Sequence, residues 1–363
     1  MTGGDDNNPG TASAGVCGGN DDENGISFPK PMIPGNQSCV LVTATNNLGA
    51  SAKLQAWIDF DGNGQFDPGE DLNTGDFAGG GANIPVGGVT GQLFCFDVPV
   101  TATFQGGAAY MRFRLSSAGS LDFDGNALDG EVEDYKLPLA KVGNFVWEDL
   151  NANGIQDETT ADGINGVTLQ LTYLGQDGIA GGVGVNADQT YTTTTATIGA
   201  DDGLYNFCGL IPGNYNVQIP TDPAGYLATP SNVSPGGDVD DSDGLPSGVN
   251  FSINDPINLV IGENSPGDNP GATFPDAQDN LTFDQGYYKP AKVGDFVWED
   301  LNGNGAQDGL EPGIGDVAVV LEGTTNSGTP VSITTVTDAT GMYMFGGLQP
   351  GTYKISFVTP TGG

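Results

Sequence analysis

A duplication constrains this chain more than any other feature of its sequence. The run KVGNFVWEDLN at Lys141–Asn151 recurs as KVGDFVWEDLN at Lys292–Asn302, 151 residues further along. A second pair follows, because GLYNF at Gly203–Phe207 returns as GMYMF at Gly341–Phe345. Two copies of one pattern at this distance indicate an array of repeated modules.

The repeated segments have the pattern of β-strands joined by tight turns. Aromatic and other residues alternate around Tyr205 and Tyr343, which is the period of a half-buried strand. Pro-Gly pairs follow at Pro212 and Pro350 as turn signals. The chain holds 60 Gly and 23 Pro, which fall between apolar, aromatic and Thr-rich runs. We therefore predict an all-β fold with many tight turns and little helix.

The charge balance excludes several classes of partner. The chain has 46 Asp and Glu residues against 9 Lys and Arg, which gives a net charge of −37 at pH 7. Nucleic acids and anionic membrane surfaces are bound through clustered Lys and Arg, so we expect neither as a partner. A compact chain with this charge must offset its self-repulsion, and bound divalent cations or high external salt would do so.

Two absences narrow the function further. The chain has no histidine, which argues against zinc chemistry, catalytic triads and imidazole acid–base catalysis. No stretch is long and apolar enough to cross a membrane, so we expect no membrane insertion in this segment. Residues 1–25 carry no charged-then-apolar leader, from which we expect either a removed leader or a piece of a longer protein.

Four cysteines allow up to two disulfides. Cys39 and Cys95 both lie in strand-like runs, and we predict that they form a disulfide; two buried thiols are the alternative. Cys17 and Cys208 are left over, and a bridge between them or to a neighbouring chain stays open.

Three segments have the ligand spacing of a calcium-binding EF-hand loop. In that loop, oxygen ligands stand at positions 1, 3, 5, 7, 9 and 12, and a Gly at position 6 allows a sharp turn. Residues 59–70 match with the ligands Asp59, Asp61, Asn63, Gln65 (through its carbonyl), Asp67 and Glu70. Residues 300–311 match with Asp300, Asn302, Asn304, Ala306 (through its carbonyl), Asp308 and Glu311. Since chance explains such repetition poorly, we predict Ca²⁺ as the cofactor.

The third copy departs from the pattern at its end. Residues 149–160 supply the candidate ligands Asp149, Asn151, Asn153, Ile155 (through its carbonyl) and Asp157. Position 12, however, is Thr160, and one residue is inserted before Gly163. We expect the last ligand to come from Glu158 or Asp162.

These residues carry a family resemblance. The run VGxFVWxDxNxNGxQD, followed by GxYxFxxLxPGxY, resembles the B-type repeat of staphylococcal serine-aspartate surface proteins, which is related to the collagen-adhesin B-type sandwich. The resemblance covers 141–290 as a whole repeat and 292–363 in part. It implies tandem β-sandwich modules of the prealbumin or immunoglobulin type, with calcium loops that lack the helices of an EF-hand. It also implies a second acidic metal run at Asp238, Asp240, Asp241 and Asp243, with Asp279 or Asp284 as a further ligand.

A second resemblance lies nearer the amino terminus. The run DGEVEDY at Asp129–Tyr135 resembles the signature of the GEVED domain, a β-module of secreted bacterial proteins. Acidic residues around this run could hold another ion or form a solvated turn. We expect four parts: 1–35, an N-terminal extension; 36–140, a GEVED-type domain; 141–290, a first B-type repeat; and 291–363, a second, incomplete one.

Three functions compete. The first is a non-catalytic, calcium-stabilised stalk or fibre subunit of an extracellular bacterial adhesin or filament, whose partners are further repeats or other copies of the chain. The second is an adhesin module that binds a host or matrix protein or a polysaccharide. The third, a glycosidase or its accessory domain, is disfavoured because the carboxylates already have metal-loop spacing. The last repeat lacks a counterpart of residues 281–288, so an open strand edge is expected there, filled by further repeats or by residues 1–35 of a neighbour.

Overall fold

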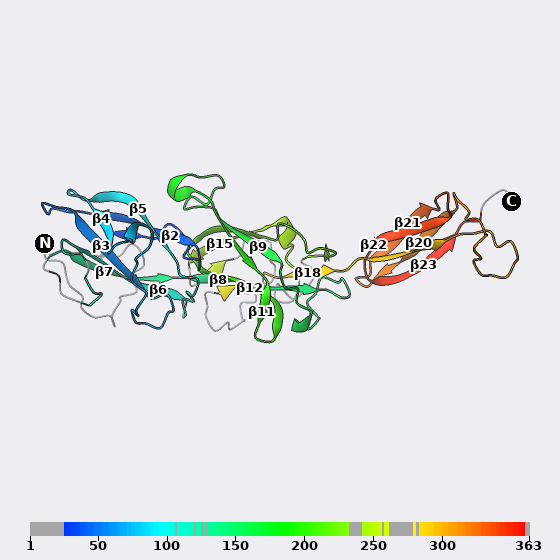
Figure 1. The fold of residues 1–363 in the computed structure, drawn as a ribbon, viewed down its shortest axis with the longest axis horizontal. Coiled ribbons are helices and arrows are strands. Elements are labelled where there is room, and N and C mark those ends of the chain that lie inside the picture. Colours follow the sequence, from blue (N-terminus) through cyan, green and yellow to red (C-terminus); the bar gives the residue numbers. More distant parts are fainter. Residues whose placement is uncertain are drawn as a thin grey trace.

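The protein is described by a computed structural model over residues 25–359, apart from 106, 120, 125–126, 128, 232–241, 256–257, 261–278 and 281–282. The described strands fall into three groups that follow one another along the long axis (Figure 1). We call them the first module (26–138), the second module (140–288) and the third module (291–357). No described strand of one module shares a sheet with another. The prediction of an all-β fold of tandem β-sandwich modules is confirmed.

The first module packs two antiparallel sheets on an aromatic core. One sheet has the order β1-β2-β5 and the other β4-β3-β6-β7. The strands are β1 (Ile26–Ser27), β2 (Gln37–Ala44), β3 (Ala52–Ile58), β4 (Ala82–Ile84), β5 (Val89–Asp97), β6 (Ala108–Ser116) and β7 (Glu131–Pro138), with the short 3-10 helix η1 (Gly75–Phe77). Phe77 lies edge-to-face against Phe94 and Phe96 between the sheets. The predicted disulfide between Cys39 and Cys95 is confirmed; it joins directly opposed positions of β2 and β5.

The second module is the larger sandwich. Its sheets have the orders β10-β9-β13-β15-β16 and β11-β12-β8-β18-β14, and β17 also pairs with β8. The strands are β8 (Ala140–Glu148), β9 (Thr168–Tyr173), β10 (Gln189–Thr194), β11 (Ala196–Ile198), β12 (Asp201–Leu210), β13 (Gly213–Gln218), β14 (Leu227–Ala228), β15 (Val249–Asp255), β16 (Asn258–Val260), β17 (Asp279–Asn280) and β18 (Gln285–Tyr288). Three short 3-10 helices are η2 (Thr160–Asp162), η3 (Gly184–Asn186) and η4 (Leu245–Ser247). The duplicated run KVGNF forms the middle of this module, because β8 pairs antiparallel with β12 on one side and parallel with β17 and β18 on the other.

The third module repeats the beginning of the second. Its sheets are β19-β22 and β21-β20-β23, formed by β19 (Ala291–Phe296), β20 (Ala318–Thr325), β21 (Pro330–Val336), β22 (Met342–Leu348) and β23 (Gly351–Phe357). KVGDF forms β19 as KVGNF forms β8, and GMYMF forms β22 as GLYNF forms β12. Among the described residues, β19 pairs with β22 alone, and no strand stands where β17 and β18 pair with β8 in the second module. Residues 1–24, which include most of the proposed donor segment, lie outside the described residues.

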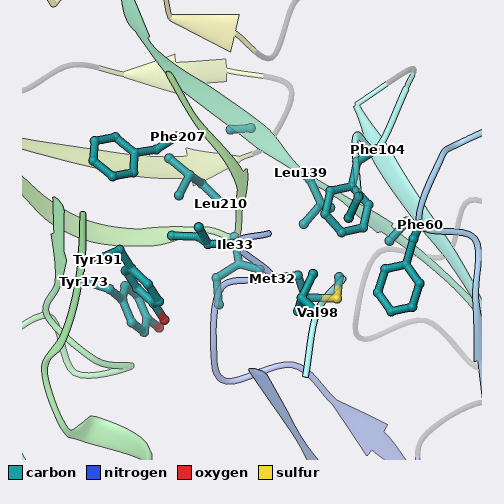
Figure 2. Packing of buried hydrophobic residues seen from close by; sticks show 14 of the residues in the cluster. Met32, Ile33, Phe60, Val98, Phe104, Leu139, Tyr173, Tyr191, Phe207 and Leu210 are labelled. Carbon is teal, nitrogen blue, oxygen red and sulfur yellow. The ribbon is translucent and has the colours of Figure 1, made fainter. Parts of the chain in front are cut away.

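The first two modules share one apolar core. Met32, Ile33 and Val98 of the first module lie between Phe60 and Phe104 on one side and Leu210 of the second module on the other (Figure 2). The Met32 N–H donates to the Gly209 carbonyl at 2.8 Å. A Cβ on Gly209 would lie 2.1 Å from the Met32 carbonyl oxygen, so the close approach requires glycine. The third module has a separate core around Leu321 and Phe345.

Polar groups hold the segment that leads into the third module. The Lys289 ammonium lies 2.6 Å from Glu148 Oε2 and 5.0 Å from the centre of the Tyr226 ring. The Tyr226 hydroxyl donates to the same Glu148 oxygen at 2.8 Å. The segment is therefore tied to the residue that ends β8.

Candidate metal centres

Each predicted metal loop leaves a strand beside a buried or half-buried tryptophan and is closed at its base. Isolated bridges pair Trp57 with Asp71, Trp147 with Gly163 and Trp298 with Gly313. The same closure therefore occurs in all three modules, although only two of them share the duplicated sequence. The segment before each loop thus places the first carboxylate of the loop at the same point, where the chain leaves the sandwich.

The loop at 59–70 is organised around Asp59. This side chain is 1% exposed and accepts the N–H groups of Gly62 (2.7 Å), Asn63 (3.1 Å) and Gly64 (2.8 Å). Gly64 has a φ of 84°, which is the left-handed turn that position 6 requires. The side-chain amide of Asn63 donates to the carboxylates of Asp61 (3.1 Å) and Asp67 (2.7 Å). Backbone amides thus hold the ligand side chains in a ring.

Glu70 closes this loop. Its Oε1 accepts the Phe60 N–H and its Oε2 the Asp67 N–H, both at 2.8 Å. One oxygen from each of Asp59, Asp61 and Glu70 lies within 4.8 Å of the others. Burial raises the pKa of Asp59 and of Glu70, and the nearby Asp59 charge adds to the shift at Glu70. Carboxylates brought together out of water in this way are costly to ionise unless a cation joins them.

The loop that begins at Asp149 has the same hydrogen bonds. Asp149 is fully buried, and its carboxylate accepts the N–H groups of Asn153 (3.3 Å) and Gly154 (2.8 Å). The amides of Asn151 and Asn153 both donate to Asp157, at 3.0 and 3.2 Å. Burial raises the pKa of Asp149. The second copy therefore repeats the backbone bonds to the first carboxylate, whereas only the loop at 59–70 brings three carboxylates within 4.8 Å of one another among the described residues.

Glu158 stands where the other loops have their twelfth-position glutamate. Its Oε1 accepts the Leu150 N–H at 2.9 Å, as Glu70 accepts from Phe60 and Glu311 from Leu301. The second oxygen accepts from the Trp147 indole at 3.1 Å. The other expected candidate, Asp162, instead forms a capping box with Thr159 at the start of η2. Of the two alternatives, the structure brings Glu158 into the loop.

The loop at 300–311 completes the set but is exposed. Asp300 accepts the N–H groups of Asn304 (3.1 Å) and Gly305 (2.8 Å), and Glu311 accepts that of Asp308 (2.9 Å). Both Asn302 and Asn304 donate to Asp308, at 2.7 and 2.9 Å. The hydrogen bond from Gly305 lowers the pKa of Asp300, the opposite direction to its buried counterparts. Without a bound cation, ionisation of Asp300 therefore costs less free energy than ionisation of Asp59 or Asp149.

Only part of the second acidic run can be described. Asp238, Asp240 and Asp241 lie outside the described residues, as does the side chain of Asp279. Asp243 is buried and exchanges two bonds with Asp284: its N–H donates to the Asp284 carbonyl (2.8 Å), and its carboxylate accepts the Asp284 N–H (2.5 Å). The neighbouring Ser242 N–H donates to the Gly154 carbonyl at 3.0 Å. The run thus contacts the loop that begins at Asp149, a tertiary contact that local spacing did not reveal.

Three acidic residues of the GEVED-like run, Asp129, Glu133 and Asp134, have structural partners. Asp134 forms a bidentate ion pair with Arg112 at 2.6 and 2.5 Å, and Glu133 accepts the Tyr135 hydroxyl at 2.5 Å. Asp129 accepts from Ser116 and Ser117, and the bonds from Ser117 chiefly lower its pKa. These bonds fasten β7 and the turn before it to β6.

The three loops fit a hard divalent cation by the chemistry of their donors. Every candidate ligand is a carboxylate, amide or carbonyl oxygen, and neither histidine nor thiol stands among them. Ca²⁺ takes six to eight oxygen ligands in flexible geometry, whereas Mg²⁺ demands a near-octahedral set and retains its water. The donor set of the loops is therefore that of a site for a hard divalent cation.

Comparison with known proteins identifies the family. The model of the SdrD B-like domain matches residues 140–266 and 291–363, which together are more than half of the chain. The chain belongs to the SdrD B-like domain family. The model of the GEVED domain matches residues 53–138, so both resemblances seen in the sequence are confirmed.

Relatives of this SdrD B-like chain are much longer proteins. Serine-aspartate repeat-containing protein D of Staphylococcus aureus (strain Newman) is 38% identical over 238 residues, which are 65% of this chain and 14% of that protein. Serine-aspartate repeat-containing protein F of Staphylococcus epidermidis is 38% identical over 229 residues, 63% of this chain and 11% of that protein. Among solved structures, domains D2 and D3 of the major pilin SpaD from Corynebacterium diphtheriae align at 12% identity and a TM-score of 0.33, covering 73% of this chain and 97% of theirs. No described helix has the length and apolar character needed to cross a membrane.

Proposed function

We propose that this chain is a non-catalytic structural part of an extracellular bacterial surface adhesin or filament, in which Ca²⁺ bound by three loops stabilises a row of β-sandwiches. The observation that carries the proposal is the repetition of one bonding pattern in three loops, down to the glutamate that accepts the N–H of loop position 2. The family supports a structural surface role. The proposed units are a GEVED-type domain at 36–140 and B-type repeats at 141–290 and 291–363.

Calcium would act on stability through charge. The proposed ligands of the three loops are those with the EF-hand spacing, with Glu158 as the last ligand of the middle loop; Asp238, Asp240, Asp241 and Asp243 would belong to a further site. Each loop contains three or more carboxylates in its sequence, and in the loop at 59–70 those of Asp59, Asp61 and Glu70 lie close together, so a divalent cation would offset their repulsion. At free Ca²⁺ about 100-fold above the dissociation constant, each site would add about 2.7 kcal/mol to the folded state.

The first two loops also contact module boundaries. From the loop at 59–70, a chain of backbone hydrogen bonds runs from Phe60 through Phe104 and Gly107 to Leu139, each between 2.8 and 3.1 Å. Leu139 immediately precedes β8 of the second module. In the second module, the Asp149 N–H donates to the Tyr287 carbonyl at 2.8 Å, two residues before Lys289. An ordered loop would therefore stiffen the boundary beside it, which suits a spacer.

The test is thermal unfolding of the full chain in millimolar calcium, in magnesium and in excess chelator, together with a calcium titration by calorimetry. We expect a large fall in melting temperature in chelator, little rescue by magnesium, and a stoichiometry of three or more ions per chain. A melt that does not change in chelator would exclude the stabilising role of calcium. Control variants that remove Asp129, whose carboxylate binds serines, should leave the stoichiometry unchanged.

A further inference from the structure

Two exposed edge strands lack the features that normally prevent edge-to-edge pairing. β10 and β21 stand at the ends of their sheets and occupy equivalent positions in the second and third modules. Proteins usually protect such edges by making them short, charged, bulged or covered. In the first module, β1 and β4 are short and β7 carries four charged residues. β5 is covered where Thr74 and Asp76 accept its N–H groups.

Within the part of the chain that the structure describes, β10 has none of these protections, and β21 has only a proline, Pro330, at its first position. The register of each strand with its one neighbour is continuous, without a bulge. No charged residue occurs between Glu322 and Asp338, a stretch that contains all of β21, in a chain of net charge −37. The same holds for β10 between Asp188 and Asp201. Two copies of the chain would therefore meet the least like-charge repulsion along these strands.

On the side away from β20, the backbone of β21 pairs with no other described strand and presents a regular row of N–H and C=O groups. Hydrogen bonds from Thr325 to Thr329 and from Thr337 to Val317, both 3.0 Å, fix which residues bond to β20. Because antiparallel pairs alternate, Ser332, Thr334 and Val336 direct their N–H and C=O groups away from β20. The side chains of all three are exposed, and Val336 is 57% exposed.

β21 is better suited to pairing than β10. Its Ile333 is 42% exposed, whereas the equivalent Tyr191 of β10 is buried, so of these two strands β21 can cover more apolar surface by pairing. The open side of β19 is a different case, because the second module fills that side with its own β17 and β18. In the second module, β10 remains an edge strand although β17 and β18 are present. The edge at the equivalent strand β21 therefore does not depend on whether the third module has counterparts of β17 and β18.

We propose that β21 is a homotypic docking edge, at which two copies of this chain pair antiparallel across a two-fold axis at Thr334. Thr334 then lies opposite Thr334 of the second copy, and Ser332 opposite Val336. The outward groups form about six hydrogen bonds. Ile333 lies directly opposite Thr335 of the second copy in a non-hydrogen-bonded pair, so the two side chains cover part of each other's exposed surface. The pairing would join chains side by side, and it does not depend on calcium, so it is independent of the proposed spacer role.

Because the chain carries a large net negative charge, we expect this association to become tighter as the salt concentration rises. Two chains of −37 repel each other over long distances; the nearest charges are Glu322, on β20 opposite Ser332, and Asp338, two residues beyond β21. Salt screens this repulsion, since the Debye length falls from about 14 Å at 0.05 M to about 4 Å at 0.5 M. Pairing through uncharged strands should thus become tighter as salt rises, whereas association through complementary charges would weaken.

The experiment is sedimentation equilibrium of the full chain in calcium at low and high salt. We expect a monomer–dimer equilibrium that tightens at high salt and weakens about tenfold or more in Thr334→Glu, which places two like charges opposite each other. The control, Thr192→Glu, makes the same charge change at the equivalent position of β10 and should leave the equilibrium as in the wild type. Circular dichroism confirms that both variants are folded.

A cysteine pair tests the register. Directly opposed, hydrogen-bonded residues have Cα atoms about 5.5 Å apart, within the range of a disulfide. Thr334→Cys should therefore give covalent dimers on oxidation above the background of the wild type, which has its own cysteines. Ser332→Cys faces Val336 of the second copy and should not. A monomer at every salt concentration, equal effects of the two glutamate variants, or equal cross-linking of the two cysteine variants would each overturn the proposal.

Discussion

Replacement of Glu158 by glutamine separates the two roles that the structure gives this side chain. The carboxylate accepts from the Leu150 N–H and the Trp147 indole, and it stands at the position of the last metal ligand. Glutamine keeps one oxygen but removes the charge. We therefore expect a loss of calcium affinity of about 100-fold, at the upper end of what perturbed metal sites show.

The effect on stability follows from mass action. With free calcium at about 100 times the dissociation constant, the intact site contributes about 2.7 kcal/mol, and a 100-fold weaker site contributes about 0.4 kcal/mol. The free energy of unfolding of the second module should thus fall by about 2 kcal/mol, which for a module of about 150 residues lowers the melting temperature by about 4–8 °C. In chelator, where no ion is bound, Glu158→Gln should instead raise the free energy of unfolding. Burial and the nearby Asp149 raise the pKa of Glu158, so removal of the charge relieves a cost in the ion-free chain.

The assay is thermal unfolding of Glu158→Gln in calcium and in chelator, with Thr160→Ala as the matched control. Thr160 occupies loop position 12 by spacing alone, so its variant should melt like the wild type in both conditions. The reasoning would be refuted by a Glu158→Gln chain that melts like the wild type in calcium, or by equal losses in the two variants. Calorimetry should show one weak site in Glu158→Gln and none in Thr160→Ala.

Three further predictions concern the disulfide, the acidic loops and the first module boundary. Reduction of Cys39–Cys95, which closes a loop of 56 residues, should cost the first module about 4 kcal/mol, and a melt unchanged by reductant would contradict this. In chelator, lowering the pH from 7 towards about 5 should raise the melting temperature, because burial holds the pKa values of Asp59, Glu70, Asp149 and Glu158 above those of the unfolded chain, near 4. That stabilisation is complete at low pH and is lost as pH rises through the folded pKa values; a profile that is no flatter in Glu70→Gln/Glu158→Gln would reject the assignment. Gly209→Ala should uncouple the first two modules into separate melting transitions, whereas Gly347→Ala, at the equivalent position with φ of 69° against 80° and open space around its Cβ, should not.

The sequence predicted those features that depend on local spacing. The duplication predicted matching strands, and the loop spacing indicated three carboxylates that backbone amides surround: Asp59 and Asp149 directly after strands, and Asp300 four residues after β19. Both are short-range patterns, in which the residues that act together are neighbours in the chain. These features can be predicted from the sequence because the turn at loop position 6 is determined by the residues of the loop itself.

Features that depend on contacts between distant residues could not be predicted in the same way. The choice of Glu158 over Asp162 depends on the Trp147 indole and on the cap at η2. Two members of the acidic cluster that could hold an ion, Asp129 and Asp134, bond to two serines of β6 and the turn after it and to Arg112. The apolar contact of Met32 and Ile33 with the second module lies in a stretch expected to be an extension, and nothing in its local pattern distinguishes it.

The parallel pairing of β8 with β18 determines how the second module bears a mechanical load. The chain enters this module at the start of β8 and leaves it at the end of β18, and these strands lie side by side in the same direction. Tension between the neighbouring modules therefore pulls the two strands lengthwise past each other, so that the bonds at Gln285–Val146, Gly286–Trp147 and Tyr287–Glu148 are sheared together and do not open one by one. A hairpin pulled from its two adjacent ends would instead unzip. The order of strands in one sheet thus makes the second module a link that resists extension.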